Sequence, residues 1–562
     1  MKKLIFAGAC TILLALNPVF SIAQERIGDF SLLDDQGYFH HMAWYDDHAV
    51  IALLVQAHDS AATARALPKF NELKKRYEDR GVQFFLINPL GGQDRNLVRA
   101  EMHAMGVDIP VLMDDTQVVS EALGIEQVGE VLLYDPEKFS VVFRGPAGDQ
   151  LEAAIEARLA GNEVAVAKVS VDGEPVSYPF MSQQVSYVND IAPLIADNCA
   201  ECHRDGGVAP FAMDSYNMLK GWSPMIREVV MTKRMPPAQI DPHVGSFTTS
   251  QNLSDKEVQN LLAWIDAGSP QDGEEDPLTQ LTWPESEWAF GEPDYIIEIP
   301  EQQIPATGVL DYIYLTVPID IEEDKWVRAS QYVAGDRSVL HHTVHDLIGP
   351  DGKRNSPLNT ARVTAYVPGG APRHEEPNTG GILRKGSAIR LNLHYTTNGK
   401  ETTDASRIGL WFYPDGFIPE ERMMGRCACI FPNAWTDIPA HHPNFEQTKS
   451  ITIEQDAHLY AHYAHMHFRG KYMRFYADYP DGSREELINI ANFSYNWQLS
   501  YEYEEPKFVP AGTRITAVGA FDNSAQNPAN PDPSSDISWG EQSWDEMFFG
   551  STQWKYVGQG SD

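Results

Sequence analysis

The chain has 562 residues, more than one hydrophobic core usually holds, so several domains are expected. Its 79 acidic residues outnumber its 43 basic residues, which gives a formal net charge of -36 at pH 7. This balance argues against nucleic acid or an anionic lipid surface as a partner bound through bulk positive charge. Only five cysteines are present, so a disulfide framework is not expected to hold the fold together.

The first residues are typical of a secretory signal peptide. Met-Lys-Lys is followed by an apolar run over residues 4–19 and by Ser-Ile-Ala at residues 21–23, a small-x-small cleavage pattern. The run is shorter than the ~20 residues that cross a bilayer, and no later stretch is apolar enough to do so. Residues 1–23 are therefore predicted to be removed, and the mature protein is expected to be periplasmic or secreted, without a transmembrane segment.

Residues 24–165 alternate buried strands with helices, which predicts an α/β domain. The expected elements are a strand over Ala49–Val55, a helix over Leu67–Tyr77, a strand over Val82–Ile87 and a hairpin of Val131–Asp135 with Val141–Gly145.

This order resembles the thioredoxin-like fold, but the redox groups of that family are missing. Its Cys-x-x-Cys position, just after the first buried strand, reads Gln56–Ala61 without sulfur, and its cis-proline position reads Val128-Gly129-Glu130. Dithiol chemistry needs a thiolate. The domain is therefore interpreted as a docking or structural module with a possible protein partner.

A polar linker over Asn162–Ser182 is expected to lead into a small helical domain at residues 185–270. The last helix is marked by Ser254 as N-cap, Glu257 three residues later, and a Gly268-to-Pro270 stop. A second, acidic linker is expected over Gln271–Glu287.

The helical domain carries Cys199-Ala200-Glu201-Cys202-His203, the c-type haem attachment pattern. A short disulfide or half of a zinc site would be the alternatives, but no second cysteine or histidine pair completes a zinc site. The unit resembles the small cytochrome c domains fused to many bacterial envelope enzymes. Cys199, Cys202 and His203 are predicted to hold one haem.

Met235, before two prolines, is the expected second axial ligand of the haem iron, and Met231 and Met225 are competitors. Methionine and histidine ligation raises the reduction potential and makes an electron carrier.

Residues 285–556 consist of short alternating apolar runs broken by turn residues, which predicts an all-β region. Two tandem jelly-roll-like sandwiches are expected, at residues 285–416 and 417–556. Expected strands include Tyr295–Ile299, Ile389–Leu393, Ile451–Ile453 and Met473–Ala477.

Histidines in this region suggest metal binding. Side chains alternate faces on a strand, so His465 and His467 share one face and form a two-point clamp. A thioether such as that of Met547 would complete a soft ligand set that favours copper over zinc. The adjacent His341 and His342 would face opposite ways, so a shared metal requires a bend there.

In chain order, these residues together with His394 resemble the copper type II, ascorbate-dependent monooxygenases, the family of the peptidylglycine and dopamine hydroxylating enzymes. The Asp-Glu-Met triplet ending at Met547 and the Leu-x-x-His-Tyr run ending at Gly399 add to the resemblance. It implies that His341, His342 and His394 hold an electron-transfer copper. His465, His467 and Met547 would hold the copper where dioxygen hydroxylates a C–H bond, with each copper on its own sandwich and facing a solvent cleft.

The chain also departs from that family. Tyr463, Phe549 and Ser551 stand where the peptide-specific enzymes bind a substrate carboxylate, so an uncharged or aromatic small molecule is favoured. Cys427 and Cys429 are predicted to be too close for an ordinary disulfide, which leaves free thiols or an accessory metal contact. The remaining nearby histidines are expected to support the ligands or to lie at the surface: His345, His441, His442, His458 and His462.

These features predict a secreted copper- and haem-dependent monooxygenase that acts on paired donors with dioxygen. Its electrons would come through the haem from an ascorbate-like reductant or an envelope cytochrome. The alternative is a non-catalytic electron-transfer or copper-binding subunit of an envelope complex. An active thiol-disulfide oxidoreductase is nearly excluded by the missing cysteines.

Overall fold

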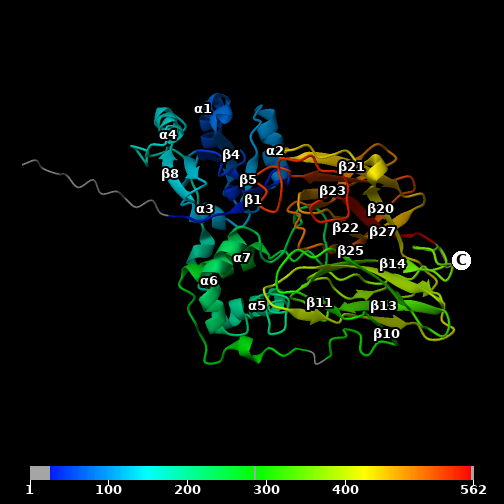
Figure 1. Cartoon of the computed structure of the whole chain (residues 1–562). Coiled ribbons are helices and arrows are strands. Elements are labelled where there is room, and N and C mark those ends of the chain that lie inside the picture. Colours follow the sequence, from blue (N-terminus) through cyan, green and yellow to red (C-terminus); the bar gives the residue numbers. More distant parts are fainter. Residues whose placement is uncertain (1–25, 284–285, 559–562) are drawn as a thin grey trace, which may run out of the picture.

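The computed structural model describes residues 26–283 and 286–558, so the predicted signal peptide lies outside the described residues. In Figure 1 an α/β domain (blue to cyan) and a helical unit (cyan to green) lie on one side of two β-sandwiches, the first green to yellow and the second yellow to red. None of the helices in the described ranges has the length and apolar character of a bilayer-crossing segment.

The α/β domain has a mixed sheet in the order β2-β1-β5-β4-β3-β7-β8. Its central strands are continuous apolar runs, such as VIALLV in β3, because helices cover both faces. β3 and β4 run parallel and β7 and β8 form the antiparallel hairpin, so the predicted thioredoxin-like arrangement is confirmed. The strands are β1 (Ser31–Asp34), β2 (Phe39–His41), β3 (Val50–Val55), β4 (Val82–Asn88), β5 (Val111–Met113), β7 (Val131–Asp135) and β8 (Ser140–Gly145), and the helices are α1 (Ala61–Tyr77), α2 (Arg95–Ala104), α3 (Val118–Ala122) and α4 (Asp149–Leu159).

The first expected linker is only partly a linker. β9 (Glu174–Pro175) pairs antiparallel with β6 (Gln127–Val128), and the Glu174 carboxylate accepts a hydrogen bond of 3.1 Å from the Ala62 backbone N–H at the start of α1. Phe180 is buried in the core of the α/β domain. Residues 173–180 therefore bind to the face of the domain where thioredoxins carry their Cys-x-x-Cys.

The helical unit consists of α5 (Ala192–Asn198), α6 (Tyr216–Met231) and α7 (Asp255–Asp266), preceded by a turn at Tyr187–Ile191. The expected capping box of Ser254 and Glu257 is present at the start of α7. Trp264 of α7 is buried inside the unit, whereas Leu262 belongs to the core of the α/β domain. α7 is thus shared between two cores.

The first sandwich packs a sheet of order β10-β19-β13-β15, with β16 also paired to β13, onto a sheet of order β12-β17-β14. Leu391 and Ile408 are among the residues that fill the space between the two sheets. Its strands are β10 (Tyr295–Glu298), β11 (Gln302–Ile304), β12 (Ile313–Pro318), β13 (Lys325–Val333), β14 (Leu340–Ile348), β15 (Arg373–His374), β16 (Gly381–Leu383), β17 (Ala388–Tyr395), β18 (Thr402–Asp404) and β19 (Arg407–Phe412).

The second sandwich packs sheet β20-β27-β22-β25 onto sheet β21-β26-β23-β24. Phe475 and Phe548 are fully buried between them. The strands are β20 (Met424–Ile430), β21 (Phe445–Thr452), β22 (Ala457–His465), β23 (Gly470–Asp478), β24 (Arg484–Ile490), β25 (Ser500–Val509), β26 (Arg514–Phe521) and β27 (Phe548–Tyr556). The all-β prediction for the C-terminal half is confirmed.

Residues 236–252, between α6 and α7, cross from the helical unit to the second sandwich. Ile240 and Phe247 belong to the core of that sandwich. Within the same segment, Asp241 is fully buried and forms a 2.6 Å ion pair with Arg95 of the α/β domain. This segment ties three domains together, which the sequence did not indicate.

Candidate metal centre

The six predicted copper ligands come from four segments of the two sandwiches. His341 and His342 lie on β14, His394 lies on β17, His465 ends β22, His467 follows it, and Met547 precedes β27. The two ligand sets therefore come from facing parts of the first and the second sandwich.

The bend that a shared metal requires on β14 is present. The register between β14 and β17 shifts between Leu340 and His342, so His341 lies in an irregularity and His342 pairs with His394. As a result, Nδ1 of His341 lies 2.7 Å from Nδ1 of His342 instead of on the opposite face.

The two ligand sets meet, which corrects the expectation that a solvent cleft separates them. The ring centroids of His342 and His394 are 4.0 Å apart, and His342 is 6.3 Å from His465 of the other sandwich. His342 is only 2% exposed, and His467 is 1% exposed. The sandwiches are closed onto each other, so these histidines form one buried cluster.

Two tyrosines close this cluster. Tyr312 of the first sandwich stacks on His394 with centroids 3.4 Å apart, and Tyr495 of the second sandwich stacks on His341 at 4.7 Å. Both hydroxyls meet Ser543, at 2.5 Å for Tyr312 and 2.7 Å for Tyr495. This Tyr-Ser-Tyr bridge joins the sandwiches four residues before Met547.

Polar partners orient the histidine rings. The Nδ1 atoms of His465 and His467 bond to the Gln498 side-chain oxygen at 2.5 Å and the Asp545 carbonyl at 3.2 Å. Such contacts determine which ring nitrogen remains for a metal. Here that nitrogen is Nε2.

Other nitrogens in the cluster lack partners. Nε2 of His342 and both ring nitrogens of His394 are buried without a hydrogen bond. Burial lowers the pKa of His342 well below its usual value and that of His394 to about 3, so these rings are neutral, the form that ligates metals. Buried unpaired nitrogens are costly, and a metal ion would satisfy them.

The chemistry of this donor set fits copper, although the rings do not surround a common point. Within residues 26–283 and 286–558, no three His, Cys, Asp or Glu side chains are placed to hold one metal ion as they stand. One reason is that the rings of His341 and His342 turn toward each other, with their Nδ1 atoms in contact, and not toward a shared metal position. Metal binding therefore requires the rings to change their orientation.

Sequence reasoning missed the part that Glu546 plays. This carboxyl is fully buried and accepts hydrogen bonds from the backbone N–H groups of His467 at 2.8 Å, Arg469 at 2.6 Å and Met547 at 3.4 Å. Burial raises its pKa to about 8. Glu546 therefore joins the segment that carries His465 and His467 to the segment that carries Met547. In the sequence, the only indication of this role was its place in the Asp-Glu-Met triplet.

In the helical unit, Cys199 and Cys202 are free and partly buried. Burial raises the pKa of the Cys199 thiol to about 12. His203 donates from Nδ1 to the Phe211 carbonyl at 3.1 Å, which leaves Nε2 for an iron atom. This arrangement fits the predicted haem attachment.

Met235 lines a different part of the molecule from the haem attachment pattern. It lines a hollow together with Leu32 and Met113 of the α/β domain, and this lining includes none of the residues of the haem attachment pattern. Of its two competitors, Met231 is buried in the core of the α/β domain and Met225 is 48% exposed. The second axial ligand therefore stays a prediction.

The additional histidines have various surroundings. His462 is buried and bonded to Thr552 at 3.2 Å and Tyr503 at 3.0 Å. His345 is also desolvated, which lowers its pKa to about 4, and its Nδ1 has no partner. His441 and His442 lie in an exposed turn, and His458 packs beside Phe508.

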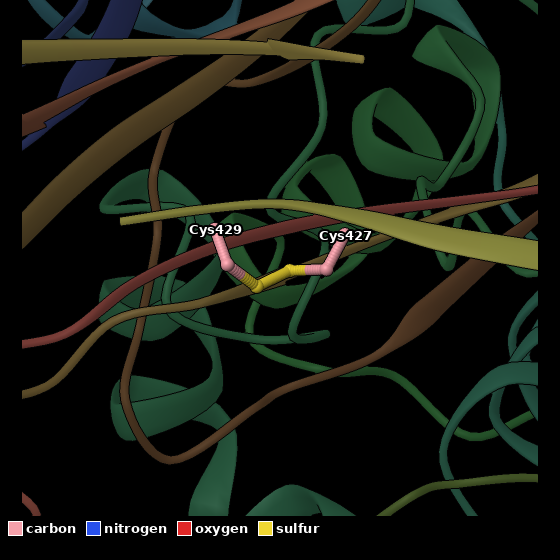
Figure 2. The surroundings of a disulfide bond; sticks show 2 residues. All are labelled: Cys427 and Cys429. Carbon is pink, nitrogen blue, oxygen red and sulfur yellow. A yellow bond between two sulfur atoms is a disulfide. The ribbon is translucent and has the colours of Figure 1, made fainter. Parts of the chain in front are cut away.

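Cys427 and Cys429 form a disulfide, which corrects the prediction of free thiols (Figure 2). Residues i and i+2 of a strand share a face, and here their Cα atoms are 5.1 Å apart, within the range that a disulfide bridges. The prediction of free thiols was wrong because the common orientation of the two side chains allows the bond.

Comparisons with known proteins concern a fraction of the chain. No family model and no curated protein matches it. A hypothetical protein of Sinorhizobium meliloti is 23% identical over 28% of this chain and 93% of its own, with a TM-score of 0.25. A conserved protein of Geobacillus kaustophilus is 18% identical over 27% of this chain and 87% of its own, with a TM-score of 0.23.

The thioredoxin domain of a thiol-disulfide oxidoreductase of Bacteroides vulgatus is 14% identical over 25% of this chain and 99% of its own, with a TM-score of 0.22. Likenesses at this level concern the fold of about a quarter of the chain and do not extend to chemistry.

Proposed function

We propose that the protein is a secreted oxidoreductase that holds two copper ions in the histidine cluster and one haem on Cys199 and Cys202, and that hydroxylates a C–H bond with dioxygen. The observation that carries this proposal is the convergence of buried histidines from three segments of the two sandwiches, among which His342 and His394 are neutral and have unpartnered nitrogens. Copper held there would supply the one-electron chemistry that dioxygen activation requires.

The protein's own residues prepare the site for that chemistry. Gln498 and the Asp545 carbonyl hold Nδ1 of His465 and His467. Glu546 holds the backbone between these ligands and Met547. Closure of the sandwiches buries His342, His394, His465 and His467, and a site with little water protects reactive intermediates.

The position of the helical unit supports the haem as the source of electrons. Burial raises the pKa of the Cys202 thiol, and Arg337 of the first sandwich acts in the opposite direction. The same thiol raises the pKa of Tyr366, after the larger effect of burial. Thr343 is the neighbour of His342. Its backbone N–H donates to the Tyr366 carbonyl, and the Tyr366 backbone N–H donates to the Thr343 hydroxyl, each at 2.9 Å. The attachment cysteines thus lie near the sandwich of the predicted electron-transfer copper.

The first test is metal analysis of the purified protein, with a haem stain. Two coppers and one haem per chain are expected, and Met547→Ala and His394→Ala should each remove about one copper. Haem without stoichiometric copper would refute the monooxygenase and leave a cytochrome fused to inert β domains.

A second candidate is a non-catalytic copper-binding or electron-transfer subunit. The closed cluster favours it, because Tyr312, Tyr495 and Ser543 cover the histidines and a buried metal without an open position suits electron transfer. Reduced, copper-loaded protein distinguishes the two. Oxygen consumption stimulated by small uncharged aromatic compounds supports the enzyme, and reoxidation without such stimulation supports the subunit.

A further inference from the structure

Cys427 and Cys429 lie on an edge strand. β20 is the first strand of the sheet β20-β27-β22-β25 and pairs with β27 only, among the described strands of that sheet. Ala428, between the cysteines, points into the core, so both sulfur atoms lie on the opposite, outer face. Both cysteines are partly exposed. An external reagent can therefore reach the disulfide.

The disulfide contributes little to the architecture. It closes a loop of three residues, and the entropy that a cross-link removes from the unfolded chain grows with the length of the loop it closes. The strand is already held by its continuous pairing with β27, from Met424 opposite Trp554 to Ile430 opposite Phe548. Opening the bond therefore leaves the fold in place.

His465 of the histidine cluster lies on the same outer face of this sheet. Cys429 pairs with Phe549 across β20 and β27, and Phe549 pairs with His465 across β27 and β22. The Phe549 ring stacks on His465 with centroids 5.7 Å apart and planes 30° apart. The sulfur pair and His465 thus lie in one cross-strand row, with a single aromatic side chain between them.

The reduced pair has the donors of a copper(I) site. Soft thiolates select Cu(I), and two thiolates on one strand face can share one ion. Opening the disulfide takes two electrons and two protons from an external dithiol, which becomes a disulfide itself. Binding then releases both thiol protons as two sulfur–copper bonds form.

We propose that Cys427 and Cys429 are a reversible dithiol–disulfide pair, and that the dithiol form binds one Cu(I) ion beside the histidine cluster. The disulfide form has no thiolate to offer, so the redox state of the pair controls this binding. The α/β domain does not reduce the pair, because Gln56–Ala61 contains no thiol. The reductant is a separate dithiol.

The test begins with the oxidised, haem-loaded full chain, treated with dithiothreitol without denaturant, desalted under argon and labelled with a maleimide. Intact mass should show no label before reduction and two labels after it. The Cys427→Ser/Cys429→Ser double variant should show none in either state. Failure of the proposed haem attachment is distinguishable, because Cys199 and Cys202 would then add two labels to both proteins.

Copper binding is measured by anaerobic titration of Cu(I) against the chromogenic chelator bicinchoninate. The reduced protein should retain one more equivalent than the oxidised protein, and the double variant should show no difference between the two states. The difference should persist in His465→Ala, which separates this site from the proposed copper of the histidine cluster.

A disulfide that resists dithiothreitol in the folded protein overturns the proposal. So does a reduced pair that takes no additional Cu(I), or an additional equivalent that disappears in His465→Ala.

Discussion

His342 lies opposite His394 in the antiparallel pairing of β14 and β17, with ring centroids 4.0 Å apart. Three of the four ring nitrogens have no hydrogen-bond partner, and the fourth, Nδ1 of His342, contacts Nδ1 of His341. This pair is the centre of the cluster. An unpaired buried polar group costs about 1–3 kcal/mol, so the folded protein without metal carries a penalty that ligation removes.

Copper is therefore expected to stabilise the fold. A metal that binds only the folded state adds about 2.7 kcal/mol at a hundredfold excess over its Kd, so the melting temperature should rise on addition of copper and fall again with a chelator. His394→Ala should reduce this rise, and differential scanning calorimetry measures it. His458→Ala, a histidine beside Phe508, is the control. An unchanged melting temperature in the wild type would argue against copper at this cluster.

Replacing Glu546 by Gln should destabilise the second sandwich by about 2 kcal/mol. The amide puts an N–H₂ group among backbone N–H donors that the carboxyl now satisfies, at 2.6 Å for Arg469 and 2.8 Å for His467. Urea unfolding of the metal-free protein checks this value. Glu505→Gln, at an exposed position, should have no effect. Equal stabilities of the two variants would contradict the structural part assigned to Glu546.

The Tyr-Ser-Tyr bridge should control access to the cluster. Ser543→Ala removes the shared partner of both tyrosine hydroxyls, and each hydrogen bond contributes about 1 kcal/mol. We expect chelators to extract copper several-fold faster from this variant, as stopped-flow absorbance would show. Tyr295→Phe, which loses a hydroxyl contact to the Asp320 backbone inside the first sandwich, should leave the rate unchanged. Equal rates in Ser543→Ala and the wild type would exclude the bridge as a barrier.

One contact between domains should depend on pH. His243, in the segment 236–252, bonds to Asp115 of the α/β domain at 3.0 Å, which raises the pKa of His243 above 6.5. The protonated form is favoured in the folded state, so this stabilisation is fully present below pH 6.5 and is lost as pH rises through the raised pKa.

Because the His243 side chain is 42% exposed, the effect is expected to stay below about 1 kcal/mol. Urea unfolding at pH 5.5 and 8.5 should show a smaller loss of stability in His243→Gln than in the wild type. Parallel pH profiles for the two proteins would show that the pair contributes nothing.

Local patterns were sufficient for several features of this protein. The capping box of Ser254 and Glu257 and the alternation of His465 and His467 involve neighbours within a few residues. The α/β and all-β regions were likewise predicted, because hydrophobic periodicity reports which faces of an element are buried. Covalent geometry and secondary structure determine such features without the rest of the chain.

Only the tertiary structure decided how the ligands meet. The irregularity beside His342, the contact between His342 and His465, and the shared serine of Tyr312 and Tyr495 depend on strand register and on the closure of two sandwiches. Residues far apart in the chain generate these contacts through packing, and packing leaves no periodic trace in the sequence. The disulfide between Cys427 and Cys429, which share one face of the edge strand β20, was likewise not predicted from the sequence.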